Sequence, residues 1–470
     1  MSDSAAQRDT WALLNVKARA RTVGLLRHVI AEDPDRFINA ITIPHRRDAA
    51  ETLAAELTPL AEACRFLQQR AHVILRNRRV GAYRRPIWLF GVTSEVRREP
   101  WGRVLILAPS NYPLMLAGIQ TIQALVAGNA VMLKPAPGCS AIGRVFVDSL
   151  YEVGVPTGVL TLLDEDPSKL DGAFSTADKV ILTGSRTTGR AVLARLTDRL
   201  TPSVMELSGC DAVFVQSDAD LALAARCLAF GLSLNSSATC MAPRRIFANE
   251  RIADALVEKL RDAIDAIGKV TVSPDEAQMI NELAGEALTQ GASIAAGTLP
   301  VESSLVLDHC TPAMRIMQAD LMAPATFIVR TKSDAEAIAQ SNQCEYRLGA
   351  TIFGQADTAM KLASRLDVGG VIINDMIVPS ADARLPFGGR GGSGFGITRG
   401  AEGLLDMTRP KTVIIRRGGP MPYLGKPKAN VDAMLRGYLK STHSRRWSDR
   451  ARALIQLAKA SRSTSVETQS

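Results

Sequence analysis

The first apolar positions of the chain recur at the spacing of amphipathic helices. Residues 25–30 place leucine, valine and isoleucine three and four positions apart, and residues 53–61 repeat the pattern. A stripe of apolar side chains on one face predicts helices, here across residues 14–79. From residue 92 to residue 100 the pattern becomes short and extended.

From residue 103 onward, short apolar runs of strand length alternate with longer helical segments. In the first block we expect strands at 103–107, 130–133, 159–163 and 179–182, and helices at 116–126, 141–151 and up to residue 196. A second block spans about 211–408, with helices at 220–232 and 251–267 and strands at 244–247 and 370–374. Repeated β-α units predict mostly parallel sheets covered by helices on both faces. The expected fold class is α/β, with two doubly wound parallel-sheet domains.

Several of these strands end in loops rich in turn residues. Residues 109–111, 134–137 and 184–189 each follow a strand. Ligands on open parallel sheets bind beyond the carboxyl ends of the strands, so these loops are candidate ligand loops. The glycine-rich run at 386–396 predicts a mobile or closely packed loop, because glycine permits tight turns.

Composition is that of an ordinary globular protein, but the charge is uneven. The 470 residues are 46% hydrophobic and 22% charged, with a net charge of +9. Between residues 426 and 462 there are ten Lys or Arg against two acids, so the rest of the chain is near neutral. We therefore expect no nucleic-acid partner. Two weakly amphipathic helical patterns, at 431–439 and 451–460, predict a solvated basic extension, and a weak contact with an anionic membrane surface stays open.

The cysteines and the N-terminus indicate the compartment. Seven cysteines are scattered along the chain, odd in number and without C-x-x-C spacing. This argues against a disulfide framework or a zinc site. The N-terminal residues lack the apolar run of a secretory signal, and no stretch has the length of a membrane span. We expect a cytoplasmic protein without a metal centre.

Three residues are candidates for catalysis, and each of them, taken alone, also has a structural explanation. Cys240 is either a small buried core residue or a nucleophile with a nearby base. Glu206 follows an apolar run and is either a paired acid or a general base whose pKa burial raises. Asn111 lies between prolines, as in a turn, yet its amide is also a donor for an oxyanion.

Seven motifs in one order resolve these alternatives. From about residue 20 to residue 417 the chain resembles the aldehyde dehydrogenase superfamily, and its long helical N-terminus is most similar to the branch that handles fatty and aromatic aldehydes. The motifs are the segment at 109–114, Ala-Gly-Asn-Ala-Val-Met-Leu-Lys-Pro at 127–135, Leu-Thr-Gly-Ser at 182–185, Glu-Leu at 206–207, Cys-x-Ala-Pro-x-Arg at 240–245, Asn-Asp at 374–375, and Pro-Phe-Gly-Gly…Ser-Gly-Phe-Gly at 386–396.

The resemblance implies NAD(P)-dependent oxidation of an aldehyde to its carboxylic acid. The Cys240 thiolate adds to the carbonyl, the Asn111 amide and the Cys240 N–H hold the oxyanion, and hydride transfer leaves a thioester. Glu206 activates the water that hydrolyses it. It also implies binding of NAD or NADP by residues of the candidate loops and one further segment. These are Pro109, Lys134, Gly184, Ser185, Gly189 and Asp320.

The chain departs from the family pattern at four places. Ser237-Ala238 stands where the family commonly has Gly-Gln, and Ser208-Gly-Cys210 replaces Gly-Gly-Lys. The segment Asp320-Leu-Met322 replaces Glu-x-Phe, which shortens the reach to the nicotinamide ribose. Pro137 replaces an acid that would repel a 2′-phosphate, so we expect NADP to be tolerated.

The resemblance also suggests how the chain is divided. We expect a cofactor domain at 1–79 and 101–208, a catalytic domain at 209–408, an oligomerisation arm at 80–100 and 409–420, and a basic tail at 421–470. A homodimer or homotetramer would form through the strands of the arm.

Two alternative functions remain: an acylating or acyl-reductase enzyme that passes the thioester to coenzyme A, and a catalytically silent scaffold. The sequence does not identify the aldehyde.

Overall fold

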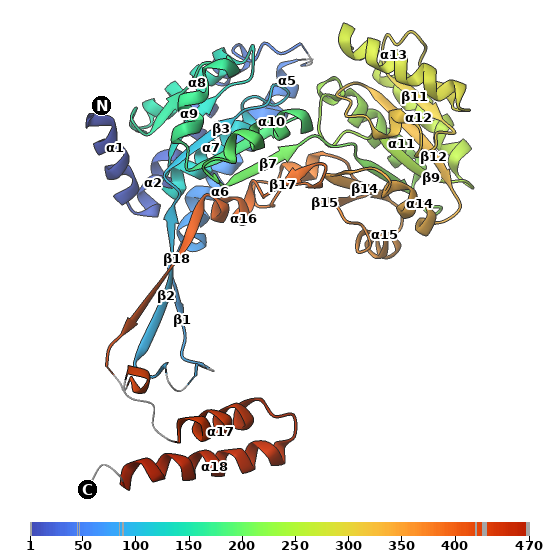
Figure 1. The fold of residues 1–470 in the computed structure, drawn as a ribbon. Helices are drawn as coiled ribbons and strands as arrows, with labels where there is room; N and C mark the ends of the chain where they lie inside the picture. Colours follow the sequence, from blue (N-terminus) through green and yellow to red (C-terminus); the bar gives the residue numbers. More distant parts are fainter. Residues whose placement is uncertain are drawn as a thin grey trace. The chain divides into compact units, whose positions relative to one another are not determined.

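The chain forms two compact units, seen in the computed structural model of Figure 1. The structure describes residues 2–44, 46, 48–83, 85–86, 89–418, 421–424 and 430–466. The first unit comprises Met1–Asn77 and Arg97–Lys411, and the second comprises Arg78–Val96 and Thr412–Ser470. None of the helices in the described part of the chain is long and apolar enough to cross a membrane.

Helices at the start of the chain pack on one sheet of the first unit. As the sequence predicts, this region is helical, and Asn15 and Asp33 begin two of the helices by accepting backbone N–H bonds. The helices are α1 Ser2–Leu13, α2 Val16–Gly24, α3 Leu26–Glu32, α4 Pro34–Ile38, α5 Ala49–Thr52, η1 Leu53–Leu57 and α6 Thr58–Ile74.

The first sheet has six strands in the order β17-β7-β6-β3-β4-β5. Strands β3 to β7 are parallel, and β17 alone is antiparallel to its neighbour. The strands are β3 Arg103–Leu107, β4 Ala130–Lys134, β5 Leu160–Leu162, β6 Lys179–Gly184, β7 Ser203–Leu207 and β17 Gly394–Phe395. The strand order reverses direction between β3 and β6, which is the position where such sheets bind ligands.

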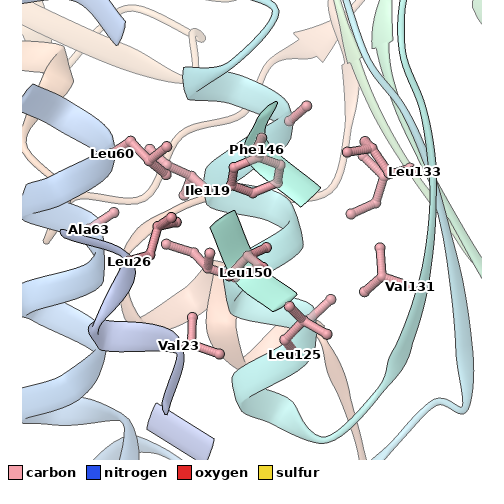
Figure 2. Packing of buried hydrophobic residues seen from close by; sticks show 14 of the residues in the cluster. Val23, Leu26, Leu60, Ala63, Ile119, Leu125, Val131, Leu133, Phe146 and Leu150 are labelled. Carbon is pink, nitrogen blue, oxygen red and sulfur yellow. The ribbon is translucent and has the colours of Figure 1, made fainter. Parts of the chain in front are cut away.

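A hydrophobic core joins this sheet to the helices on one face. Figure 2 shows side chains of α2, α3 and α6 meeting those of α7, α8 and β4. Every residue of α7 is buried, and Gly128, with φ of 100°, ends it in the left-handed conformation. The helices that follow the strands are α7 Met115–Ala127, α8 Ser140–Glu152, α9 Asp171–Thr176 and α10 Arg186–Leu196.

The second sheet of the first unit has seven strands in the order β10-β11-β12-β9-β8-β14-β15. All neighbours are parallel except the edge pair β10–β11. Its strands are β8 Ala212–Val215, β9 Arg245–Asn249, β10 Ser293–Ala296, β11 Leu305–Asp308, β12 Ala325–Thr331, β14 Gly349–Phe353 and β15 Gly370–Ile373. Its helices are α11 Leu221–Ser233, α12 Ala253–Ile267, α13 Pro274–Thr289, α14 Asp334–Ser341 and α15 Ala356–Ala363. Two such sheets confirm the predicted α/β class.

The glycine-rich run is closely packed, one of the two outcomes that the sequence allowed. A Cβ on Gly388 would lie 2.3 Å from the Gly396 carbonyl oxygen, and the turns here leave no room for it. The surrounding elements are β13 Tyr346–Arg347, η6 Val378–Ala381, β16 Arg390–Gly391 and α16 Gly400–Asp406. Strand β17 of this run lies beside β7, with Gly394 opposite Glu206.

The second unit contains strands and a helical pair. Its sheet has the order β1-β2-β18, built from β1 Arg78–Val80, β2 Val92–Pro100 and β18 Thr408–Arg416. Helices α17 Val431–His443 and α18 Trp447–Val466 lie side by side (Figure 1), after the short turn η7 Pro422–Leu424. Both helices fall where the sequence predicts them.

Candidate active site

A cavity of about 760 Å³ opens at the carboxyl ends of β3, β4, β6 and β7. It is bounded by the loops that the sequence predicted to hold a ligand. Of the predicted site residues, eight line it: Pro109, Asn111, Lys134, Gly184, Ser185, Glu206, Cys240 and Asp320. Gly189 does not line the cavity. It packs on β7 instead, where an added Cβ would lie 2.9 Å from the Leu207 side chain.

Cys240 lies on a short loop before β9 and is half-buried. The turn that presents it, η4 Leu234–Ser237, holds Asn235, Ser236 and Ser237 at φ of 52°, 51° and 63°. Such left-handed backbone is strained in residues other than glycine. Burial raises the pKa of the Cys240 thiol, and the nearby Glu206 carboxylate adds to the effect. The resting group is therefore a thiol, and the reaction needs a base to remove its proton.

A buried arginine holds the Cys240 turn. Arg244 Nη1 donates to Ser237 Oγ at 2.8 Å and to the Ala323 carbonyl oxygen at 2.6 Å, while Nη2 donates to the Ser237 carbonyl oxygen at 2.5 Å. The guanidinium thus links this turn to the segment that carries Asp320. Ser237, a departure from the family pattern, is one of its partners.

Asn111 is fixed beside the same turn. Its Nδ2 donates to the Ala238 carbonyl oxygen at 3.0 Å, and its Oδ1 accepts from the Tyr112 N–H at 3.0 Å. The Tyr112 hydroxyl lies 2.6 Å from Thr239 Oγ1, so two side chains join the segments. An amide nitrogen carries two hydrogens, which leaves Asn111 a second N–H to donate.

Glu206 is the buried carboxyl group of the cavity. It is 3% exposed, and its Oε2 accepts from Thr398 Oγ1 at 3.1 Å and from Gln120 Nε2 at 3.5 Å. Its Oε1 has no hydrogen-bond partner in the described structure. Burial raises the pKa of Glu206, opposed by the positive charge of Arg399. A carboxylate with a raised pKa is a stronger base than an ordinary one, and its partner-free oxygen is the position that can accept a proton.

The far end of the cavity has groups suited to a dinucleotide. Ser185 caps α10 by accepting from the Thr188 N–H at 3.1 Å, which leaves earlier N–H groups of the helix open to a phosphate. Lys134 ends β4 and is 7% exposed. Asp320 Oδ1 is buried without a partner, and burial raises the pKa of this carboxyl group against a hydrogen bond from Ser208. An orphaned carboxylate oxygen fits a ribose hydroxyl donor.

The helix that begins beside Asn111 is capped from a distant segment. Glu56 Oε2 accepts the backbone N–H of Met115 at 2.6 Å and of Leu114 at 3.2 Å, and its Oε1 pairs with Arg46 at 2.8 Å. Burial raises the pKa of Glu56 to about 7, and Arg46 opposes the shift. This pair anchors one wall of the site and was not predicted, because two charged residues in an N-terminal helical pattern give no signal of burial.

Arg399 is a further buried charge that the sequence reasoning missed. It is 4% exposed, has φ of 61°, and its guanidinium lies 4.1 Å from the centre of the Phe387 ring. Its Nη1 donates to the Ser380 carbonyl oxygen at 2.8 Å, whereas Nε is buried without a partner. Its charge acts on both Glu206 and Cys240. The one available signal was an arginine just after the last motif.

Known proteins resemble this chain over most of its length. The model of the aldehyde dehydrogenase family matches residues 1–413. The 4,4'-diapolycopene aldehyde oxidase of Methylomonas sp is 31% identical, covering 87% of this chain and 79% of its own length. The 4,4'-diaponeurosporen-aldehyde dehydrogenase of Staphylococcus aureus is 26% identical over 88% and 92% of the two chains. A structure of NADP-dependent glyceraldehyde-3-phosphate dehydrogenase from Bacillus halodurans with NADP superposes with a TM-score of 0.79, at 27% identity over 88% and 90%.

Proposed function

The chain belongs to the aldehyde dehydrogenase family, and from that premise we propose that it oxidises an aldehyde to its carboxylic acid with NAD or NADP. The observation that carries the proposal is the shared cavity. Cys240, Glu206 and Asn111 line it together with Lys134 and Ser185. A nucleophile, a base and an oxyanion donor therefore face the same space as the groups suited to a dinucleotide.

In the first step, the Cys240 sulfur forms a bond to the aldehyde carbon. The thiol proton must leave, and Glu206 is the acceptor with a raised pKa and a free oxygen. The carbonyl oxygen becomes an oxyanion as its π bond breaks. The second N–H of Asn111 Nδ2 and the backbone N–H of Cys240 are the donors that stabilise it.

In the second step, the thiohemiacetal loses hydride and becomes a thioester. A nicotinamide cofactor, when bound in this cavity, would supply the hydride acceptor. Asp320 and Lys134 would hold its two riboses, and the N-terminus of α10 its pyrophosphate. Glu206 then releases the thiol proton to solvent and, as the carboxylate, takes a proton from water, whose oxygen attacks the thioester carbon. The carbon–sulfur bond breaks, Cys240 regains its proton, and the acid leaves.

The test is the loss of aldehyde-dependent NAD(P)H formation in Cys240→Ala. Cys227 on α11 is the matched control, since it is the other half-buried cysteine of the chain. We expect Cys240→Ala to abolish NAD(P)H formation and Cys227→Ala to retain it. Activity that survives Cys240→Ala would contradict the mechanism. A parent protein inactive on a broad aldehyde panel would favour the silent scaffold.

Product analysis separates hydrolysis from acyl transfer. Glu206 favours hydrolysis, because a buried base with a free oxygen activates water. We expect the free acid as product with or without coenzyme A. An acyl-coenzyme A product, and no turnover without the thiol, would establish the acylating alternative instead.

The substrate class proposed is an extended apolar aldehyde. Two relatives are named for a 4,4'-diapolycopene aldehyde and a 4,4'-diaponeurosporen-aldehyde, and Leu116 is an apolar residue of the cavity lining. An aldehyde panel from short aliphatic to long-chain and aromatic should give kcat/KM values that rise with apolar size. A preference for short or carboxylated aldehydes would contradict this proposal without affecting the chemistry at Cys240.

We further propose that NADP is accepted. Pro137 lines the cavity three residues after Lys134, where it brings no charge. The negative charge of Glu165 raises the pKa of Lys134, and Ser140 Oγ donates to the Glu165 carboxylate at 2.6 Å. Pro137→Glu should lower kcat/KM for NADP relative to NAD, and Glu165→Gln should raise it. A parent preference for NAD of about a hundredfold, or about 2.7 kcal/mol, would refute NADP tolerance.

A further inference from the structure

Helices α17 and α18 form a hairpin that exposes one apolar face. The turn at residues 444–446 joins them, and Gly437 permits their closest approach, since a Cβ there would lie 3.3 Å from the Leu457 Cβ. Figure 1 shows the two helices side by side. The side chains that this contact does not cover include six large apolar ones, here called the hairpin face: Val431, Leu435, Leu439, Trp447, Leu454 and Ile455.

The hairpin face lies on a single side of the helical pair. Val431, Leu435 and Leu439 are four residues apart, so they form one row along α17. Trp447, Leu454 and Ile455 form the corresponding row on α18. At about 100° per residue, the α17 row is turned by about 120–160° from Gly437 and the α18 row by about 60–160° from Leu457. The average turn has the same sense in both helices, and because the helices are antiparallel both rows emerge on the same side.

The hairpin face exposes more apolar surface than we expect of an extension that contacts only solvent. Leu435, Leu439, Leu454 and Ile455 are each more than half exposed, and Trp447 is 82% exposed. Single exposed apolar residues are ordinary, but a contiguous face marks a surface that binds something. Tryptophan at its edge is typical of a group placed at a membrane–water interface.

The charge around the face selects the partner. The two acids of the hairpin are already paired, Asp432 with Arg436 at 2.8 Å and Asp449 with Arg452 at 2.7 Å. A net excess of cations remains on the flanks and in the turn: Lys440, Arg445, Arg446, Arg450 and Lys459. A second copy of the hairpin would bring the same positive charge and be repelled, whereas an anionic surface is complementary.

We propose that the α17–α18 hairpin docks the protein on anionic lipid. The hairpin face enters the boundary between headgroups and acyl chains, as amphipathic helices do. Arg445 and Arg446 precede Trp447 directly, so their guanidinium groups reach lipid phosphates while the indole inserts beside them. This inference is independent of the chemistry at Cys240.

Co-sedimentation of the full-length protein with vesicles tests the proposal. We expect binding to phosphatidylcholine vesicles that contain phosphatidylserine, little binding to phosphatidylcholine alone, and loss of binding at high salt. Arg445→Glu combined with Arg446→Glu should weaken binding by at least about 30-fold, since each basic residue near an anionic surface contributes about a fivefold factor. Leu435→Ser combined with Leu439→Ser should weaken it at every salt concentration.

The matched controls are exposed apolar residues outside the hairpin. Leu13 is 86% exposed and Met360 is 61% exposed, and Leu13→Ser or Met360→Ser should leave binding unchanged. Circular dichroism of every variant checks that the helices persist. The proposal is overturned if the parent fails to bind anionic vesicles at low salt or if the charge reversal binds equally. It is also overturned if the hairpin variants only change the molecular mass in solution, because the face would then join two copies.

Discussion

Glu206 has two roles in the proposed cycle, and its replacement should separate them. Glu206→Gln keeps the shape of the side chain but cannot accept a proton. We expect hydrolysis of the thioester to slow by about 10²–10⁴-fold, the usual contribution of a general base. A stopped-flow record should show slower NAD(P)H formation in the first turnover, because the Cys240 thiol loses its proton acceptor, and a still greater loss in later turnovers, because the thioester is not hydrolysed. Equal loss of the first and later turnovers would mean that Glu206 is needed only for the addition of the thiol.

The pH dependence of the parent follows from the same residue. Burial raises the pKa of Glu206 above the ordinary value of 4.5 for a glutamic acid. The carboxylate is the active form, so kcat should rise with pH through this raised pKa and then level. A profile of kcat between pH 5 and pH 9 measures it. An acidic limb at or below the ordinary pKa would contradict the role of burial.

Arg399 should tune both reacting groups without contacting the substrate. Its positive charge opposes the rise in the pKa of Glu206 and of Cys240. Arg399→Gln should therefore move the acidic limb of the rate profile upward by about one pH unit, at the low end of what a nearby charge does. It should also slow alkylation of Cys240 by iodoacetamide at fixed pH. Arg399→Lys retains the positive charge and should restore both the pH profile and the alkylation rate. If the effect of Arg399→Gln came only from lost packing on Phe387, Arg399→Lys would not restore them.

At the scale of single residues, the sequence predicts the residues that line the cavity better than the residues that hold them in place. The eight candidates that line it sit in motifs or at strand ends. Arg399 lies in a segment without hydrophobic periodicity, and the Glu56–Arg46 pair lies in a region whose pattern looks like that of a surface helix. Their burial arises from contacts between distant parts of the chain, which local patterns do not encode.

At the scale of local elements, the turn before Cys240 has a strained backbone and a side-chain hydrogen bond that stabilises it. Ser237 has φ of 63°, and its Oγ accepts from Arg244 at 2.8 Å. Ser237→Ala would lose the hydrogen bond and keep the strain, at a cost of about 1–3 kcal/mol. Ser237→Gly loses the same bond but relieves about 1 kcal/mol of strain. We therefore expect Ser237→Gly to melt above Ser237→Ala and below the parent. Scanning calorimetry gives the order, and Ser237→Gly melting above the parent would show that the Arg244 bond contributes little.

Prediction of elements succeeded for some of the continuous apolar runs and failed for others. Strands β3, β4 and β6 are buried on both faces and stand out, and their predicted positions are confirmed. Strand β7 was not predicted, because Glu206 interrupts its apolar run with a charge that only the cavity accommodates. Strands β8, β11, β12 and β14 were likewise not predicted, although they are apolar and almost wholly buried. A short apolar run of this length does not by itself distinguish a buried strand from a buried helix segment, so its pattern alone does not decide the element.

For the molecule as a whole, the second unit presents an unpaired strand edge. In the order β1-β2-β18, strand β18 is an edge, and its Ile414 and Ile415 are 65% and 43% exposed. Successive residues point to opposite faces of a sheet, so both faces are open at this edge. Natural proteins protect such edges with charge or by pairing them. The proposed homo-oligomer would pair this edge with a second copy of the chain.

Lysines on the strand should prevent that assembly. Ile414→Lys combined with Ile415→Lys places two charges on the edge, and like charges facing each other across a two-fold axis repel. We expect light scattering to give a dimer or tetramer for the parent and the 50.4 kDa of one chain for the variant. Ile294→Lys is the matched control, since Ile294 is 40% exposed on β10, the edge of the seven-stranded sheet. Assembly that persists in the double variant, or is lost equally in the control, would exclude β18 as the pairing edge.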